Sequence, residues 1–114
     1  MRLGQDKVLL NDILSAIEWI EKHTEDISEE EFKKNDVLAY AVIKNIEIMG
    51  EASTGLSEEI KSKNPQIEWR EIKDMRNILV HAYSKINLDI LWDTIVNKLP
   101  KLKEQIINII KENQ

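Results

Sequence analysis

The sequence is poor in the residues that make tight turns and covalent cross-links: it has no cysteine, three glycines and two prolines in 114 residues. The absence of cysteine excludes disulfides and thiolate metal sites, and it makes a reducing cytoplasm the expected compartment. So few glycines and prolines argue against short strands joined by tight turns. The longest uninterrupted apolar run, Val37–Ile43, is far too short to cross a bilayer, and Met1–Lys7 has no apolar core of a signal peptide.

A basic surface is also missing, because the formal net charge is −5 and the sequence pI is about 5.1. This argues against a protein that coats nucleic acid without specificity, but it leaves room for a local basic pocket. Hydrophobic residues make up 42% and charged residues 32% of the chain, which is typical of a soluble globular protein. The length suits one compact domain, residues 1–114, whose stability is modest or shared with a partner subunit.

Apolar residues recur every three or four positions along most of the chain, which predicts helices that bury one side. The expected helices span about residues 6–23, 36–54, 58–63, 67–84, 87–99 and 101–111, with a short helical turn after Ser28. The residues suited to cap them are Asp6, Ser28, Asn35 or Asp36, Ser57 and Asn87. Pro100 is expected to kink or break the helix that contains it. The pattern predicts an all-α antiparallel bundle of four to five main helices.

The expected helix 36–54 has an unusually wide apolar surface. Its apolar residues are Leu38, Tyr40, Ala41, Val42, Ile43, Ile46, Ile48 and Met49. A surface that wide indicates two buried faces, one for the core and one for another subunit. The small residues Gly50, Ala52 and Ser53 make the end of this helix slim, so we expect another segment to approach it closely there.

The stretch Met75–Tyr83, MRNILVHAY, places four functional side chains on what is expected to be one helix: Arg76, Asn77, His81 and Tyr83. On a helical wheel Tyr83 returns to nearly the azimuth of Arg76, while Asn77 and His81 are neighbours four residues apart. His81 lies about 140° from Arg76 on this wheel. One helix therefore offers a broad polar patch, and a symmetric second copy would let these groups converge.

Each of these residue types has a use in RNA cleavage. The forked donors of arginine match phosphate oxygens, and histidine titrates near neutrality and can transfer a proton. Asparagine can fix the imidazole or the substrate, and tyrosine can stack on a base or donate to phosphate. Together they could promote attack of a ribose 2′-hydroxyl on its own phosphodiester, with the cation stabilising the developing charge.

Other interpretations of these residues stay open from the sequence alone. Arg76 could be a solvated or ion-paired surface residue, His81 a structural one and Tyr83 a half-buried bundle residue. A di-iron bundle would need Glu-x-x-His pairs, which neither histidine has. No segment marks a nucleophile elbow for a Ser-His-Asp triad. A phosphotransfer bundle needs one accessible histidine, and either His81 or His23 could serve.

Read as R-N-x-x-x-H-x-Y, Arg76–Tyr83 resembles the R-x4-H-x-Y motif of the HepT-like toxins, within the HEPN superfamily of ribonucleases. Met49–Ala52 resembles that family's (I/M)GEA segment. Pro65–Asn77 resembles its P-x-I-x-W-x-x-I-x-x-M-R-N run, and Trp92 and Leu99-Pro100 fit the helix that follows. The resemblance covers almost the whole chain, from about residue 8 to 110.

This resemblance implies an all-α HEPN-type bundle that forms a homodimer, with both motif helices lining a shared cleft. It implies a toxin that cleaves transfer RNA or messenger RNA as an endoribonuclease without a metal or another cofactor. Arg76 would bind phosphate and stabilise the transition state, His81 would be the general acid or base, and Asn77 would position either the substrate or His81.

The same resemblance implies a partner, a separately encoded minimal nucleotidyltransferase antitoxin that adenylylates Tyr83 in a type VII-like toxin–antitoxin pair. Bulk and negative charge added there would block the phosphate site beside Arg76. Since the chain is acidic, RNA binding would depend on a local pocket, and the candidates beside Arg76 are Lys44, Arg70, Lys73 and Lys85. The alternative is a non-catalytic HEPN module that binds a nucleotidyltransferase or nucleic acid.

Overall fold

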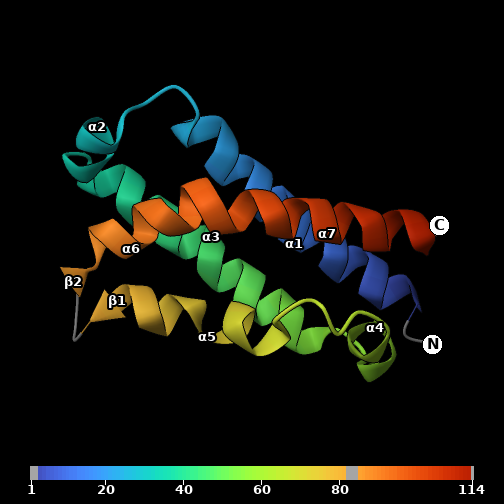
Figure 1. The fold of residues 1–114 in the computed structure, drawn as a ribbon. Coiled ribbons are helices and arrows are strands. Elements are labelled where there is room, and N and C mark those ends of the chain that lie inside the picture. Colours follow the sequence, from blue (N-terminus) through green and yellow to red (C-terminus); the bar gives the residue numbers. More distant parts are fainter. Residues whose placement is uncertain (1–2, 82–84, 114) are drawn as a thin grey trace.

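The computed structural model of the chain describes residues 3–81 and 85–113. Its helices are α1 (Leu3–Thr24), α2 (Glu29–Lys33), α3 (Asp36–Gly55), α4 (Glu58–Lys63), α5 (Trp69–Leu79), α6 (Leu88–Asp93), the π-helical turn η2 (Thr94–Lys98) and α7 (Leu99–Glu112). Two short strands, β1 (Val80–His81) and β2 (Lys85–Ile86), form one antiparallel pair. The all-α class expected from the sequence is confirmed (Figure 1). Within the described residues, no helix is long and apolar enough to span a membrane.

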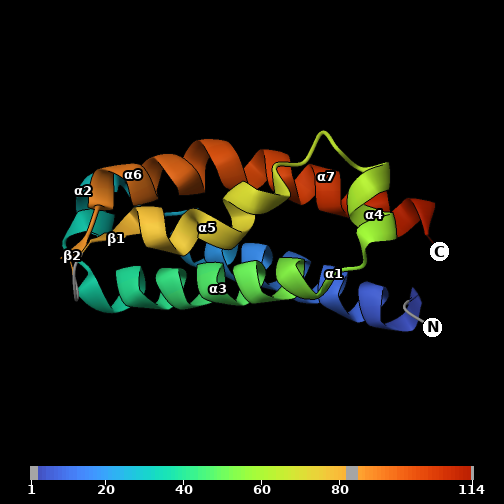
Figure 2. The same ribbon diagram turned by 90° about the horizontal axis from the view of Figure 1, so that it is seen from below.

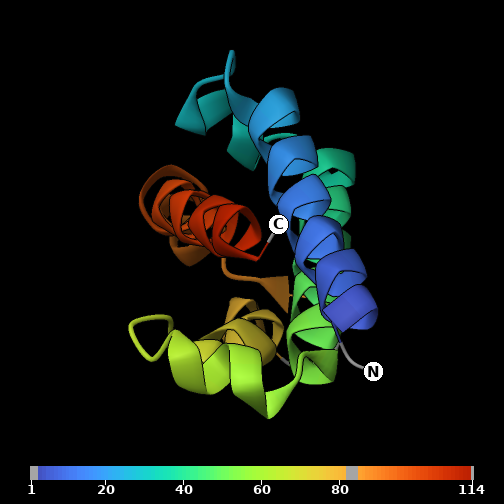
Figure 3. The ribbon, with the colours of Figure 1, turned by 90° about the vertical axis from the view of Figure 1, so that its right-hand side faces the viewer.

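Helix α3 is the centre of the arrangement, because it packs against α1 on one side and α5 on the other. Helix α7 packs on α1. Both neighbours of α3 run opposite to it, as Figure 2 shows. Seen end-on, α7 and the α4–α5 segment lie on the same side of the α1–α3 pair (Figure 3). Helix α5 is therefore held mainly by α3, and its outer side is left to solvent.

The core is built mainly from α1, α3 and α7, with further side chains from α2, α5 and α6, and it consists of the residues that give the sequence its periodicity. Its largest fully buried side chains include Leu10, Ile13, Ile17, Ile20, Phe32, Ile46, Met49, Leu91, Ile106 and Ile109. Fully burying a side chain of this size stabilises a fold by about 1.5–3 kcal/mol before the loss of conformational entropy is counted. Packing of these apolar stripes, more than helix propensity, therefore holds the bundle together.

The expected helix caps agree with the structure except at Asp6. Ser28 forms a complete capping box with Glu31, and Asn35 caps α3 by accepting a hydrogen bond from a backbone N–H. Asp6 is not a cap, because α1 already begins at Leu3 and encloses it. Its buried carboxylate instead accepts hydrogen bonds from the Ser57 N–H at 2.9 Å and from the Ser57 hydroxyl at 2.6 Å. The residue thus joins the start of α1 to the start of α4.

The sequence predicted that Pro100 would either kink or break its helix, and the second of these expectations is wrong. Helices α6, η2 and α7 follow one another without a break, and Pro100 lies in the first turn of α7. Proline has no N–H to donate to the carbonyl four residues earlier, and its ring crowds that carbonyl. The chain responds with the π-helical turn, in which the Leu99 N–H donates to the Thr94 carbonyl, five residues back.

Candidate active site

The contact between α3 and α5 fixes the position of Arg76. At Gly50 the two backbones come so close that a Cβ there would lie 3.4 Å from the carbonyl oxygens of Ile72 and Lys73. The close approach expected at the slim end of α3 is therefore confirmed. Because the two helices are antiparallel, Arg76, one turn beyond Ile72 and Lys73 on α5, lies beside Glu47, one turn before Gly50 on α3.

Arg76 is ion-paired with Glu47. Its Nε donates a hydrogen bond to Oε2 of Glu47 at 3.0 Å. The other carboxylate oxygen, Oε1, lies 4.0 Å from Nζ of Lys44, one turn earlier on α3. Lys44, Glu47 and Arg76 thus form a cluster with one net positive charge on an acidic chain. Within residues 3–81 and 85–113, the terminal amino groups of Arg76 make no hydrogen bond.

Helix α5 ends earlier than the sequence predicts, at Leu79 and not near residue 84. The carbonyl of Leu79 accepts a hydrogen bond from the Asn87 N–H at 2.7 Å. In a continuing helix that carbonyl would accept from residue 83 instead. Val80 pairs with Ile86 and His81 with Lys85, so the backbone turns from helix into a short ladder. The apolar spacing predicted too long a helix because pairing with residues 85–87, just beyond the expected helix, decides where this helix ends.

This earlier helix end changes the geometry expected for the motif. Asn77 lies on α5, whereas His81 lies on β1, so the two are not neighbours on one helix, and the 140° relation between Arg76 and His81 is wrong. The backbone of His81 is described, but its side chain is not. Tyr83 lies outside the described residues. Arg76 and His81 are therefore held by different elements that meet where α5 gives way to β1.

The exposed side of α5 carries the cations expected there. Arg70, Lys73 and Asn77 are all exposed and are spaced three and four residues apart, so they form one stripe along the helix. Arg76 is three residues from Lys73 and lies to the side of this stripe, towards α3. Asp74, four residues after Arg70, lies on the same side of α5, so this stripe carries two cations and one carboxylate.

The other two candidate cations lie at the same end of the molecule but on other elements. Lys44 is exposed on α3 and reaches Arg76 through their shared partner Glu47. Lys85 is exposed on β2, and its backbone pairs with that of His81. Glu47 itself was missed from the sequence, although its place three residues before Gly50 puts it on the side of α3 that α5 approaches.

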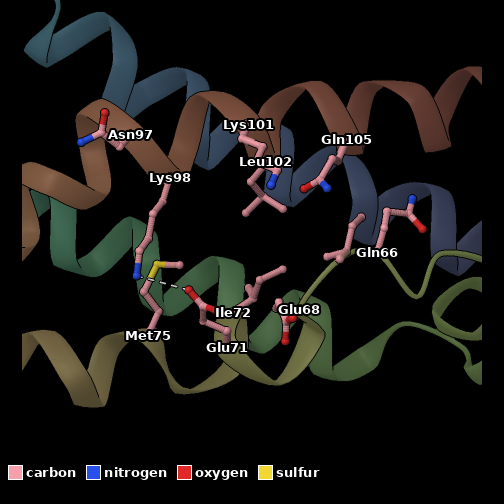
Figure 4. A pocket seen from close by; sticks show the side chains of 11 residues that line it. Gln66, Glu68, Glu71, Ile72, Met75, Asn97, Lys98, Lys101, Leu102 and Gln105 are labelled. Atoms are coloured by element: carbon pink, nitrogen blue, oxygen red, sulfur yellow. Dashed lines mark hydrogen bonds and ion pairs between the residues drawn. The ribbon is translucent and has the colours of Figure 1, made fainter.

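A cavity of about 200 Å³ lies on the other side of α5, between α5 and the η2–α7 segment. Glu71 and Lys98 reach towards each other at its edge and form an ion pair at 3.3 Å (Figure 4). Its floor is apolar and includes Ile72, Met75 and Leu102. Neither Arg76 nor Asn77 lines this cavity, so it is separate from the Arg76 cluster.

Comparison with known proteins identifies the family of this chain. The family model described as ribonuclease HepT-like matches residues 13–109. The chain is 41% identical to a probable ribonuclease HepT of Thermococcus cleftensis over 85% of this chain and 88% of that one. It is 35% identical to a putative RNase of Caldanaerobacter subterraneus over 92% and 94%. It is also 42% identical to a gamma-glutamylcyclotransferase and putative RNase of Methanocaldococcus jannaschii, over 93% of this chain but 48% of that longer protein. No solved structure matches significantly.

Proposed function

Because the chain belongs to the HepT-like ribonuclease family, we propose that it is an endoribonuclease that cleaves RNA through Arg76 and His81 without a metal ion. The observation that best supports this proposal is the arrangement of Arg76. Its guanidinium is hydrogen-bonded through Nε to Glu47 at a tight helix–helix contact, and its side chain is 44% exposed. It stands among cations on a chain whose net charge is −5. Such a local positive site suits one phosphate group more than a whole RNA surface.

The reaction follows from the chemistry of these two residues. The ribose 2′-oxygen bonds to phosphorus as the bond to the 5′-oxygen of the next nucleotide breaks, which leaves a 2′,3′-cyclic phosphate and a 5′-hydroxyl. His81 moves the proton, taking it from the 2′-hydroxyl or giving it to the leaving oxygen. Arg76 binds the phosphate and stabilises the negative charge that develops on it. Asn77, exposed one residue after Arg76, positions the substrate or His81.

A homodimer would complete this site. Val37, Tyr40, Lys44 and Ile48 recur at spacings of three and four and so form one stripe on α3, beside the Arg76 cluster. Three of these four are large hydrophobic residues that are left exposed, with Val37 81% exposed. An exposed apolar stripe of this kind supports a docking face for a second copy, related by a two-fold axis as in most dimers. Two Arg76 clusters would then flank one cleft.

The biological role we propose is that of a toxin in a type VII-like toxin–antitoxin pair in the cytoplasm. Its partner would be a minimal nucleotidyltransferase that adenylylates Tyr83. The AMP group would add negative charge and bulk close in sequence to His81 and Arg76, and thereby exclude RNA. Transfer RNA or messenger RNA would reach the site along Lys44, Arg70, Lys73 and Lys85. The match over residues 13–109 supports one HepT-like domain across residues 1–114.

The test is cleavage of total transfer RNA and of messenger RNA by the purified protein in excess EDTA, beside His81→Ala. Intact mass is measured first, so that a protein already modified at Tyr83 is recognised. We expect the wild type alone to produce fragments with 2′,3′-cyclic phosphate ends. If the unmodified wild type cleaves neither RNA, the chain is a non-catalytic module that binds a nucleotidyltransferase or nucleic acid. Phosphohistidine formed with a kinase donor would instead indicate phosphotransfer.

A further inference from the structure

Glu47 is the acidic side chain that contacts Arg76, and it comes from a different helix. We infer that Glu47 is a positioning residue for RNA cleavage: it holds the Arg76 guanidinium by Nε, so that the forked terminal amino groups face the scissile phosphate. This inference rests on the proposed function, because it assigns Arg76 the phosphate.

The atom of Arg76 that Glu47 contacts decides whether Glu47 positions the guanidinium or blocks phosphate from it. A carboxylate that occupied both terminal amino groups would compete with phosphate for the same fork. Glu47 instead accepts one hydrogen bond, from Nε at 3.0 Å. Phosphate and Glu47 can therefore bind the same guanidinium at different edges.

The close packing of α3 on α5 fixes the positions from which Glu47 and Arg76 meet. Glu47 lies one turn from Gly50, where α3 and α5 approach closely, and Arg76 lies one turn from Lys73, whose carbonyl faces Gly50. An arginine side chain has many rotamers, and a substrate that must order it loses binding free energy. Holding Arg76 in advance removes that loss from the reaction step and keeps the donors where charge develops.

The surrounding charges also fit this role. Oε1 of Glu47 lies 4.0 Å from Nζ of Lys44, so the carboxylate has a cation on each side. The net charge of the three side chains is therefore positive. The Glu47 side chain is 32% exposed and that of Arg76 44% exposed. Ion pairs as accessible as this contribute little to folding, because water screens them. Loss of Glu47 should therefore affect the reaction far more than the stability.

The experiment compares Glu47→Ala and Glu47→Gln with the wild type in single-turnover and steady-state cleavage of RNA. Glu18→Ala is the matched control: it removes the same charge from an exposed position within α1, where Glu18 makes no hydrogen bond or ion pair with any described residue. All three changes raise the net charge by one, so a general electrostatic effect on RNA binding is common to them.

We expect Glu47→Ala to lower kcat by about tenfold or more, with KM changed little, because misplacing a group that acts in the transition state affects the chemical step. Glu47→Gln keeps an oxygen that can accept from Nε, so its kcat should fall between those of Glu47→Ala and the wild type. Glu18→Ala should stay within about twofold of the wild type, as expected for a surface change away from the site. Unfolding temperature and oligomer mass should be the same in all four proteins.

Three results would overturn the inference while the proposed function stands: Glu47→Ala as active as Glu18→Ala, a change confined to KM, or faster cleavage by Glu47→Ala. Faster cleavage would mean that Glu47 competes with phosphate. A wild-type protein that cleaves no RNA would overturn the proposed function and this inference with it. If Glu47→Ala fails to fold, the kcat of Glu47→Gln decides between the same outcomes.

Discussion

The backbone N–H of Asn87 donates a hydrogen bond to the carbonyl oxygen of Leu79 at 2.7 Å. This bond joins the end of α5 to the residue before α6, next to the β1–β2 pair that contains the backbone of His81. The same residue caps α6, because its Oδ1 accepts a hydrogen bond from the Ile90 N–H at 3.1 Å. One residue thus connects the helix that carries Arg76, the strand that carries His81 and the helix that follows.

We therefore expect Asn87→Ala to reduce RNA cleavage by more than its effect on folding would suggest. Loss of a cap of this type costs about 1 kcal/mol of stability. The lost cap also loosens the end of the β1–β2 pair, and with it the placement of His81 relative to Arg76. The measurement is kcat beside the free energy of unfolding from urea titration.

Asn35→Ala is the control for this change, because Asn35 caps α3 in the same way, with Oδ1 accepting from the Leu38 N–H at 3.0 Å. We expect both variants to lose similar stability and only Asn87→Ala to lose cleavage. Equal kcat values in the two variants would show that the α6 cap has no part in placing the site.

The capping box at α2 makes a prediction about pH. Hydrogen bonding with Ser28 lowers the pKa of the Glu31 carboxyl below its usual value. The Ser28 backbone N–H has the larger effect and the Ser28 hydroxyl the smaller one. A group whose pKa is lowered by folding stabilises the fold above its unfolded-state pKa, and this contribution is lost as the pH falls through the folded-state pKa. Ser28→Ala removes the hydroxyl but keeps the backbone N–H, which is the larger cause, so we expect the pKa of Glu31 to rise only part of the way towards its usual value. An NMR titration of the Glu31 carboxyl measures this, and an unchanged pKa would show that the Ser28 hydroxyl does not contribute to the lowering.

Local chemistry explains which parts of this fold could be predicted from the sequence. Ser28, Asn35 and Asn87 act within three residues of themselves, so their patterns were sufficient to predict helix starts. Asp6 has the same chemistry, but its partner is Ser57, 51 residues away, and no local pattern contains that distance. The helix expected to reach residue 84 ends earlier because the Leu79 carbonyl accepts its hydrogen bond from Asn87, a residue outside the expected helix.

The candidate site divides in the same way. The spacing of Arg76 and His81 follows directly from the sequence. That Arg76 could be ion-paired was also one of the interpretations that the sequence left open. The identity of its partner could not, because Glu47 lies 29 residues earlier and reaches Arg76 only through the packing of α3 on α5. Gly50 was the available clue, since it marked where the two helices meet.

The packing at Gly50 leads to a graded prediction. In Gly50→Ala the added Cβ would lie 3.4 Å from two carbonyl oxygens, which is a tight but tolerable contact, and alanine favours the helix by about 1 kcal/mol over glycine. In Gly50→Val the extra methyl groups would press on the same carbonyls, at a cost of about 1–3 kcal/mol. We expect near-normal stability and cleavage for alanine. For valine we expect a lower unfolding temperature and a larger loss of kcat, since α5 would move Arg76 away from Glu47. Equal behaviour of the two variants would mean that α3 and α5 are not in close contact in solution.

The exposed stripe on α3 gives a direct test of the proposed dimer. Val37→Glu places a charge at the most exposed apolar residue of this stripe, where it would have to be buried against the second copy. Val8→Glu is the matched control, because Val8 is a valine on α1 that is also exposed, by 59%.

We expect light scattering to show a dimer for the wild type and for Val8→Glu, and a monomer for Val37→Glu at the same concentration. Each residue is already exposed within one chain, so Val8→Glu should unfold at nearly the wild-type temperature, and Val37→Glu should lose only the stability that dimerisation contributes. If the cleft is shared, cleavage by Val37→Glu should recover as its concentration is raised. A fully active monomer would show that one copy of Arg76 and His81 is enough.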